Sequence, residues 1–212
     1  MQLTLGRFAA LTVAAVAWTG LVVQLIASTE LTGSIGQAIW SMARYFTVIT
    51  NLLAALLFTA VALGQDARPK LVGLVTLAIL LVGIVYATML RGLVELSGGA
   101  ALADFLLHSV TPVVVPLWWL MFAPREGLGW RDPWQWALLP LVYFAYALVR
   151  GAIEGRYAYP FMDVGNLGWP AVLSNAALMA AGFVVGGYGL VAISVGRAGR
   201  RGAHNPQASE SR

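Results

Sequence analysis

The chain has 212 residues, of which 59% are hydrophobic and only 10% are charged. A soluble domain usually carries about 25% charged residues. This composition and the mean hydropathy of +0.78 therefore exclude an ordinary soluble globule and indicate an integral membrane protein. The chain has no cysteine, which excludes disulfides, thiolate metal sites and cysteine nucleophiles. In such a protein the net charge of +4 mainly sets topology, so it does not predict nucleic-acid binding.

Six segments free of Asp, Glu, Lys and Arg are long enough to cross a bilayer, which takes roughly 17–25 apolar residues as helix. Only helices and closed barrels satisfy their backbone groups in lipid, and the alternating pattern of barrel strands is missing. We predict an all-α membrane protein, with one six-transmembrane-helix bundle over residues 1–196 and a disordered basic cytoplasmic tail over 197–212. The predicted spans are about 7–28, 44–64, 71–91, 103–123, 133–150 and 173–196.

Three apolar stretches need a decision about their boundaries. The first charge-free run, 8–29, is longer than the apolar region of a signal peptide, which is about 7–15 residues, so we predict a span. The segment 31–43 is rich in Gly and Ser, so we predict a loop with an interfacial turn around Trp40. The segment 164–172 contains Gly, Asn and Pro, which also predicts a loop.

Arg and Lys are distributed unevenly over the predicted loops, and the side that carries more of them is expected to be cytoplasmic. Nine flank the side that holds both termini, and four flank the other side. We therefore predict that both termini are cytoplasmic. The nine are Arg7, Arg68, Lys70, Arg125, Arg131, Arg197, Arg200, Arg201 and Arg212, and the four are Arg44, Arg91, Arg150 and Arg156.

Polar residues gather where the second predicted span begins. Arg44, Thr47 and Asn51 stand at positions i, i+3 and i+7, so they share one face of a helix, with Thr50 beside them. Polar groups at membrane depth are costly and are treated as functional candidates. A threonine near a helix end can also simply bond its own backbone.

The fourth predicted span begins with a second polar group. Asp104 and His108 are four residues apart and can touch. Pro112 has no N–H for the carbonyl of His108, so the helix should bend there. If the two helices start near residues 43 and 103, Thr47 and His108 both lie roughly 6–8 Å deep from the outer side. Asp104 could instead be only a helix cap, and His108 a packing residue.

Three motifs in this order resemble the six-span androgen-induced membrane proteins and their bacterial relatives. They are Tyr45-Phe46-Thr47-Val48-Ile49-Thr50-Asn51, then His108 followed by Pro112, Pro116 and Leu117-Trp118-Trp119, and then Tyr159-Pro160-Phe161-Met162-Asp163. The animal members of that family are threonine hydrolases that cleave fatty-acid esters of hydroxy fatty acids. They differ in having Asp where this chain has Thr50, and a second His where it has Phe105.

The resemblance implies an intramembrane lipid-ester hydrolase with Thr47 as nucleophile and His108 as base, on the outer-leaflet side of a bacterial cytoplasmic membrane. A threonine hydroxyl needs such an adjacent base. Asp104 could orient the imidazole, and Asn51 or Thr50 could donate to the oxyanion. The substrate-binding candidates are Arg44, Arg91, Arg150 and Tyr159.

No cofactor or metal is implied, and the expected partners are lipids and the bilayer rather than nucleic acid. The alternative function is a non-catalytic lipid- or anion-binding membrane protein or a small transporter. The same polar helix ends and arginines would serve an anion path, but transporters often show broken helices repeated in two halves, and no repeat is evident here.

Overall fold

The structure is a computed structural model that describes residues 2–124 and 126–203, and all regular secondary structure in this part of the chain is helical. Five helical segments are long and apolar enough to cross a membrane, and a sixth is obtained if α2 (Ile35–Met42) and α3 (Phe46–Ala62) form one bent span. The predicted all-helical fold is confirmed, and these helices are consistent with a multi-pass membrane protein. The five are Thr4–Thr32, Pro69–Leu90, Gly98–Phe122, Asp132–Glu154 and Val164–Gly196.

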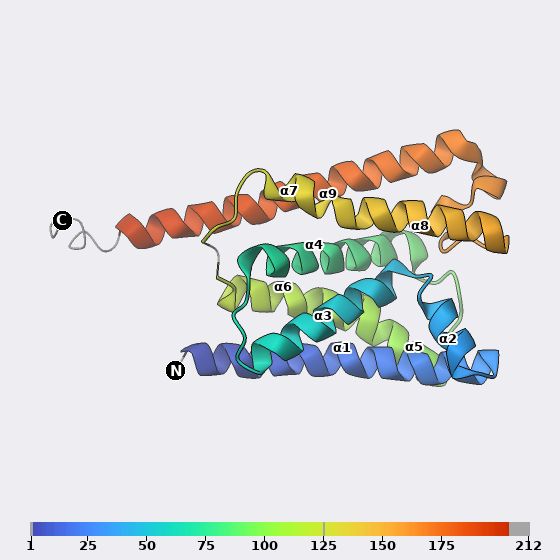
Figure 1. Ribbon diagram of the computed structural model, residues 1–212, viewed down its shortest axis with the longest axis horizontal. Helices are drawn as coiled ribbons and strands as arrows, with labels where there is room; N and C mark the ends of the chain where they lie inside the picture. Colours follow the sequence, from blue (N-terminus) through green and yellow to red (C-terminus); the bar gives the residue numbers. More distant parts are fainter. Residues whose placement is uncertain (1, 125, 204–212) are drawn as a thin grey trace.

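The long helices alternate in direction along the bundle (Figure 1). The start of α1 and the end of α9 lie at one end, which we call the terminal end. The opposite end, which we call the distal end, carries α2 and the connections over 91–97 and 155–163. The other elements are α1 (Gln2–Thr32), α4 (Pro69–Val85), α5 (Gly98–Phe105), α6 (Thr111–Phe122), α7 (Asp132–Trp136), α8 (Leu138–Glu154) and α9 (Val164–Ala203).

Two π-helical turns interrupt the bundle near its distal end. The turn η1 (Tyr86–Leu90) extends α4, and η2 (Leu106–Val110) joins α5 to α6. Pro112 cannot donate to the carbonyl of His108, so the backbone widens there instead of continuing as a regular α-helix. Such π-helical turns often occur at functional sites.

Two glycines allow neighbouring helices to approach η2 closely. A Cβ atom built on Gly20 of α1 would lie 2.6 Å from the Leu107 side chain, and one on Gly83 of α4 would lie 2.6 Å from Pro112. Both distances are shorter than any normal carbon contact. Glycine at these positions therefore holds η2 tightly between α1 and α4, which fixes the position of His108.

The segment 31–43 contains a helix, so its prediction as a loop was wrong. Ser34 caps α2 by accepting a hydrogen bond from the Gln37 N–H at 3.3 Å. Ala38 and Met42 on the inner face of α2 are buried. This cap and this apolar face outweigh the helix-weakening Gly and Ser residues, and the chain turns by 99° between α2 and α3.

The last long helix also starts earlier and ends later than predicted. α9 begins at Val164, where the Asp163 carboxylate accepts a hydrogen bond from the Asn166 N–H at 3.1 Å. Gly168, with φ of 73°, makes a kink that keeps the Gly- and Pro-containing stretch helical on both sides. The helix continues to Ala203, so the predicted disordered tail does not begin at residue 197, and positions 204–212 lie outside the described residues.

Candidate active site

Thr47 lies in the first turn of α3, and its position follows from the extended backbone of Tyr45. Tyr45 occupies the N-cap position with φ of −98° and ψ of 130°, and the helix begins at Phe46. Figure 1 shows that α3 starts short of the distal end, because α2 occupies that end. Thr47 is therefore buried, with 5% of its surface exposed.

His108, on η2, is the partner of Thr47. Its Nε2 atom lies 3.2 Å from Thr47 Oγ1. The two residues are 61 positions apart in the chain, so this contact is created by the packing of η2 against α3. The structure thus brings together the two residues that the sequence singled out.

The other ring nitrogen of His108 faces Asp104. Nδ1 lies 3.0 Å from the Asp104 carboxylate and 3.2 Å from the Asp104 backbone carbonyl. Both of these oxygens are acceptors, so the Nδ1 atom of a neutral imidazole carries the proton and Nε2 is left as the acceptor for the Thr47 hydroxyl. The arrangement has the logic of a hydrolase triad.

Asp104 does not cap its helix. α5 begins at Gly98, with Ser97 in the N-cap position, whereas the sequence predicted that this span begins near residue 103. Asp104 lies within the helix and points its carboxylate at neighbouring side chains. The contact with His108 is therefore the local role that the structure gives it.

Tyr86 extends this chain of contacts and was not singled out from the sequence. Its hydroxyl donates to the second carboxylate oxygen of Asp104. Its ring stacks on the His108 imidazole, with ring centroids 4.4 Å apart and an interplanar angle of 17°. The only signal in the sequence was a tyrosine in the last turns of the third apolar segment, at the end where Thr47 and His108 were expected.

Asn51 and Thr50 are buried beneath Thr47 and hydrogen-bond the backbone. The Asn51 amide donates to the carbonyls of Thr47 at 2.9 Å and Leu107 at 3.3 Å. The Thr50 hydroxyl donates to the Phe46 carbonyl at 2.9 Å. Both side chains are at most 1% exposed. Asn51 joins α3 to η2, Thr50 bonds only within α3, and neither donor points into open space.

Arg44 and Arg150, which are largely buried, form a cluster with the partly exposed Glu154 and the exposed Trp40. Arg150 contacts Glu154 at 2.8 Å and the Trp40 carbonyl at 2.6 Å, and its guanidinium lies 4.1 Å from the centre of the Trp40 ring. Arg44 forms an ion pair with the same glutamate. Two cations thus share one anion, and Nε and Nη1 of Arg44 have no partner among the described residues. Arg91 stands apart from the cluster and is exposed.

Tyr159 places its hydroxyl next to Thr47 from the connection between α8 and α9. Burial raises the pKa of this phenol above its usual value of 10.0, while hydrogen bonds with the Thr47 side chain and with the backbone of Thr47 and Phe46 act in the opposite direction. The first N–H groups of a helix have no acceptor within it. The first N–H groups of α3 therefore meet at the Tyr159 oxygen, which lies beside the Thr47 hydroxyl.

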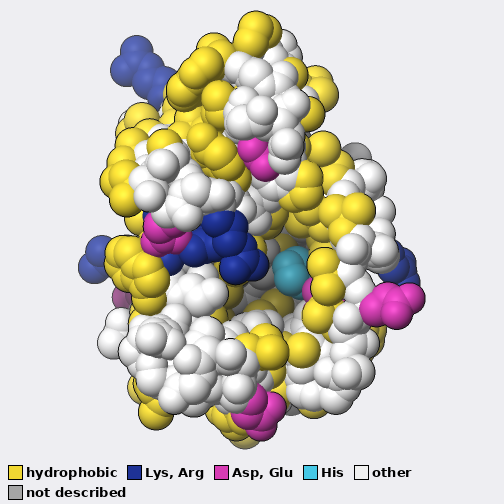
Figure 2. Space-filling model, turned by 90° about the vertical axis from the view of Figure 1, so that its right-hand side faces the viewer, with side chains coloured by type: hydrophobic (Ala, Val, Ile, Leu, Met, Phe, Trp, Pro, Cys, Tyr) yellow, Lys and Arg dark blue, Asp and Glu magenta, His cyan; other side chains and the backbone are white. Residues whose placement is uncertain are grey.

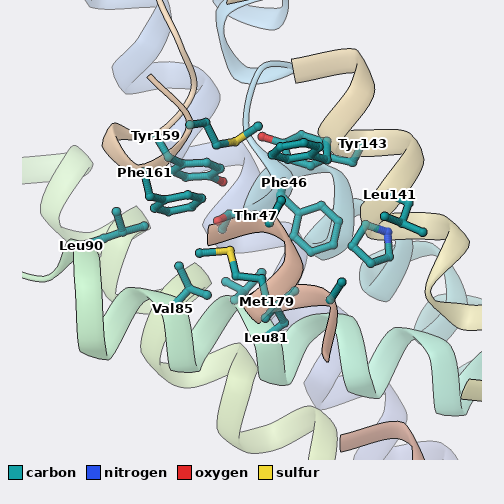
Figure 3. Close-up of a pocket in the computed structure, with 16 residues that line it drawn as sticks. Phe46, Thr47, Leu81, Val85, Leu90, Leu141, Tyr143, Tyr159, Phe161 and Met179 are labelled. Atoms are coloured by element: carbon teal, nitrogen blue, oxygen red, sulfur yellow. The ribbon is translucent and has the colours of Figure 1, made fainter. Parts of the chain in front are cut away.

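Thr47 also lines an apolar pocket. Figure 3 shows Tyr159 and Phe161 on one side of Thr47, and Met179, Leu81 and Val85 on the other. His108 does not line this pocket. Thr47 therefore stands between the imidazole and the apolar space.

The distal end is hollowed where these elements meet. Figure 2 shows Arg or Lys side chains and a histidine exposed beside one another in this hollow, with hydrophobic side chains around them. His108 retains 19% exposure of its side chain and Asp104 retains 20%. The contact series Thr47–His108–Asp104 is therefore accessible from the distal end of the bundle, as well as through the pocket wall at Thr47.

Comparisons of the chain with protein-family models, with curated proteins and with solved structures found no match.

Proposed function

We propose that the protein is a membrane-embedded hydrolase that cleaves a lipid ester, with Thr47 as nucleophile and His108 as general base. The observation that supports it best is the connected series Thr47–His108–Asp104 with distances of 3.2 and 3.0 Å, which ends at an apolar pocket. A weak nucleophile, an adjacent base and a third group that orients the base are the arrangement that acyl transfer requires. The proposal agrees with the resemblance to the androgen-induced family.

In the first step the Thr47 hydroxyl attacks the ester carbonyl carbon as its proton passes to His108 Nε2. The new C–O bond gives a tetrahedral intermediate with a negative oxygen. When the bond to the alcohol breaks, the alcohol oxygen takes the proton back from Nε2. The products are a free alcohol and an acyl group esterified to Thr47.

In the second step water attacks the acyl-threonine, and His108 Nε2 takes a proton from it. Collapse of this intermediate breaks the bond to Thr47 Oγ1, which recovers the proton from His108. The Asp104 carboxylate stabilises the imidazolium that forms twice in each cycle. Tyr86 holds the carboxylate through its second oxygen.

The negative oxygen of both intermediates needs donors that are already in place. We assign this role to the Tyr159 hydroxyl, which lies next to Thr47, and to the first N–H groups of α3, which meet at the Tyr159 oxygen. The positive end of the α3 dipole adds to the effect. Asn51 and Thr50, which the sequence suggested for this role, hydrogen-bond backbone carbonyls instead.

Arg44 remains the best placed of the predicted substrate-binding arginines. Its cluster carries one more positive than negative charge, which would attract an anionic group of a lipid. The charge distribution over the loops supports an orientation with both termini in the cytoplasm. In the proposed orientation, the distal end faces the outer leaflet of a bacterial cytoplasmic membrane.

A fluorophosphonate probe tests the proposal, because it reacts with an activated hydroxyl and reports it by covalent labelling. The purified wild type should be labelled at Thr47 and should hydrolyse p-nitrophenyl butyrate. Thr47→Ala should lose both properties. Thr59→Ala, on the same helix but bonded to Ala55 and Trp18, is the matched control and should keep both.

If neither labelling nor turnover occurs, the protein is not a threonine hydrolase. The same pocket and the excess positive charge would then favour a non-catalytic lipid- or anion-binding protein. Equal labelling of wild type and Thr47→Ala would show that another hydroxyl reacts and would also contradict the proposal.

A further inference from the structure

A second apolar cavity, the α4–α9 groove, continues from the pocket at Thr47. It lies between α4 with η1 on one side and α9 on the other. Leu81, Val85 and Met179 line both the pocket and the groove. The two spaces therefore follow one another along α4 and α9.

The groove offers no free polar side chain within the described structure. Its two polar lining residues are Thr88 and Asn175. The Thr88 hydroxyl donates to the Ile84 carbonyl at 2.7 Å, and the Asn175 amide donates to the Phe161 carbonyl at 3.1 Å. An occupant of this groove would meet aliphatic and aromatic surface, which fits a hydrocarbon chain.

The chemistry at Thr47 determines which part of an ester lies in the apolar pocket and the groove. His108 must protonate the leaving alcohol oxygen, so the alcohol has to depart on the side of the imidazole. His108 does not line the apolar pocket, whereas Thr47 does. The alcohol therefore leaves toward the hollow at the distal end, and the acyl chain occupies the opposite side.

We infer that the α4–α9 groove is the acyl-chain site of the enzyme, and that it makes the enzyme selective for long acyl chains while placing no comparable limit on the alcohol. The inference rests on the proposed hydrolase function. At 1.5 Å per residue, the groove extends about 10 Å along α9 from Met179 to Gly186. A palmitoyl chain would fill pocket and groove, whereas a butyryl chain would occupy only the pocket at Thr47.

Two glycines of α9 give a matched test. Gly182 lines the groove and Gly189 does not. A Cβ atom added at either position meets no other atom within 4 Å, so both positions accept a side chain. Gly182→Phe should obstruct the groove, and Gly189→Phe controls for a large side chain on the same helix.

The measurement is kcat/KM for p-nitrophenyl palmitate and p-nitrophenyl butyrate, which differ only in the acyl chain. Gly182→Phe should lower the palmitate value by about tenfold or more and leave the butyrate value within about twofold, because the obstruction lies beyond the reach of the short chain. Gly189→Phe should resemble wild type with both esters. Equal palmitate values in wild type and Gly182→Phe would overturn the inference.

A second series fixes the acyl group as butyryl and varies the alcohol from butanol to hexadecanol. Gly182→Phe should not change the preference within this series. If the variant discriminates by alcohol length instead, the groove holds the alcohol and not the acyl chain. The inference then fails, although the proposed hydrolase function survives.

If the wild type hydrolyses no ester, the proposed function fails, and the groove is tested by binding alone. A diazirine-bearing palmitate, activated by light, should label the α9 residues 175–186 in wild type and in Gly189→Phe, and should label them much less in Gly182→Phe. Equal labelling of all three proteins would show that the groove is not an acyl site.

Discussion

Each end of the bundle has an acidic side chain in contact with other polar groups, but the two carboxylates have different roles. At the terminal end, Asp132 is 1% exposed, lies 2.9 Å from Lys70 Nζ and accepts a hydrogen bond from the Gly129 N–H at 2.8 Å. At the distal end, Asp104 contacts His108 and Tyr86. The first carboxylate holds a connection in place, and the second orients a group that can transfer a proton.

The remaining polar contacts show the same contrast. At the terminal end, the Trp118 indole donates to the Gly6 carbonyl at 2.9 Å, and Trp134 donates to Tyr188 at 2.7 Å. Each of these bonds joins two helices and, in the part of the chain that the structure describes, is not connected to a pocket. The distal series instead ends at a hydroxyl on the wall of a pocket. The comparison teaches that buried polar contacts alone do not identify a site, and that their connection to accessible space does.

The largest effect on kcat should come from removing the proposed nucleophile or the proposed base at the distal end. Thr47→Ala and His108→Ala should each lower kcat by at least about 10³-fold, and the double variant should be scarcely worse than either single one, because nucleophile and base act as a unit. Ester hydrolysis by equal amounts of detergent-purified protein measures this. Losses that multiply in the double variant would mean that the two residues serve separate functions.

Asp104→Asn should have the next largest effect, a loss of roughly 10²-fold or more in kcat, because an amide can hold the imidazole in the unproductive tautomer. Asp163→Asn is the matched control: Asp163 is also at the distal end but caps Asn166. It should retain wild-type turnover. If the two variants behave alike, Asp104 is a structural acid like Asp132, and the contrast between the two ends disappears.

Tyr159→Phe removes one proposed donor to the oxyanion and keeps the ring that packs on Phe161. Because this bond is strongest in the transition state, kcat should fall by about 10²-fold while KM changes little. Tyr157→Phe, in the same connection, should be unaffected. A change confined to KM would show that Tyr159 binds substrate and does not stabilise the oxyanion.

The smallest effect on catalysis is expected at the terminal end. Asp132→Ala removes a charged hydrogen bond and should destabilise the fold by about 1–3 kcal/mol, with little from the ion pair because the Lys70 side chain is 58% exposed. The melting temperature should fall, while kcat per folded molecule should match wild type. A large loss of kcat would contradict the assignment of a purely structural role to this end.

Several features could be predicted from local pattern because they depend on neighbours along the chain. The charge-free segments predict the helices, since a helix satisfies its backbone within itself and its apolar surface tolerates lipid. The spacing of Asp104 and His108 predicts their contact on one helix. Pro112 predicts the irregular backbone at His108, because the missing N–H is a property of that residue alone.

Other features were missed or misassigned because they depend on groups that are distant in sequence. Tyr86 gains its role only where η1 lies beside η2 and its ring stacks on His108. Asn51 lies on the predicted face, but its donors are taken by the carbonyls of Thr47 and Leu107. Gly and Ser between residues 31 and 43 suggested a loop, and the cap and the buried face of α2 decided otherwise.

The sequence by itself therefore determined the helical class of the protein and two separate polar helix ends, because hydropathy and short spacings act through adjacent turns. Only the tertiary structure decided that Thr47 lies within reach of His108 and beside an apolar pocket. That contact depends on the bend between α2 and α3 and on the close approach of α1 and α4 to η2 at Gly20 and Gly83. Such packing distances are set by side chains from several helices at once, and no local pattern specifies them.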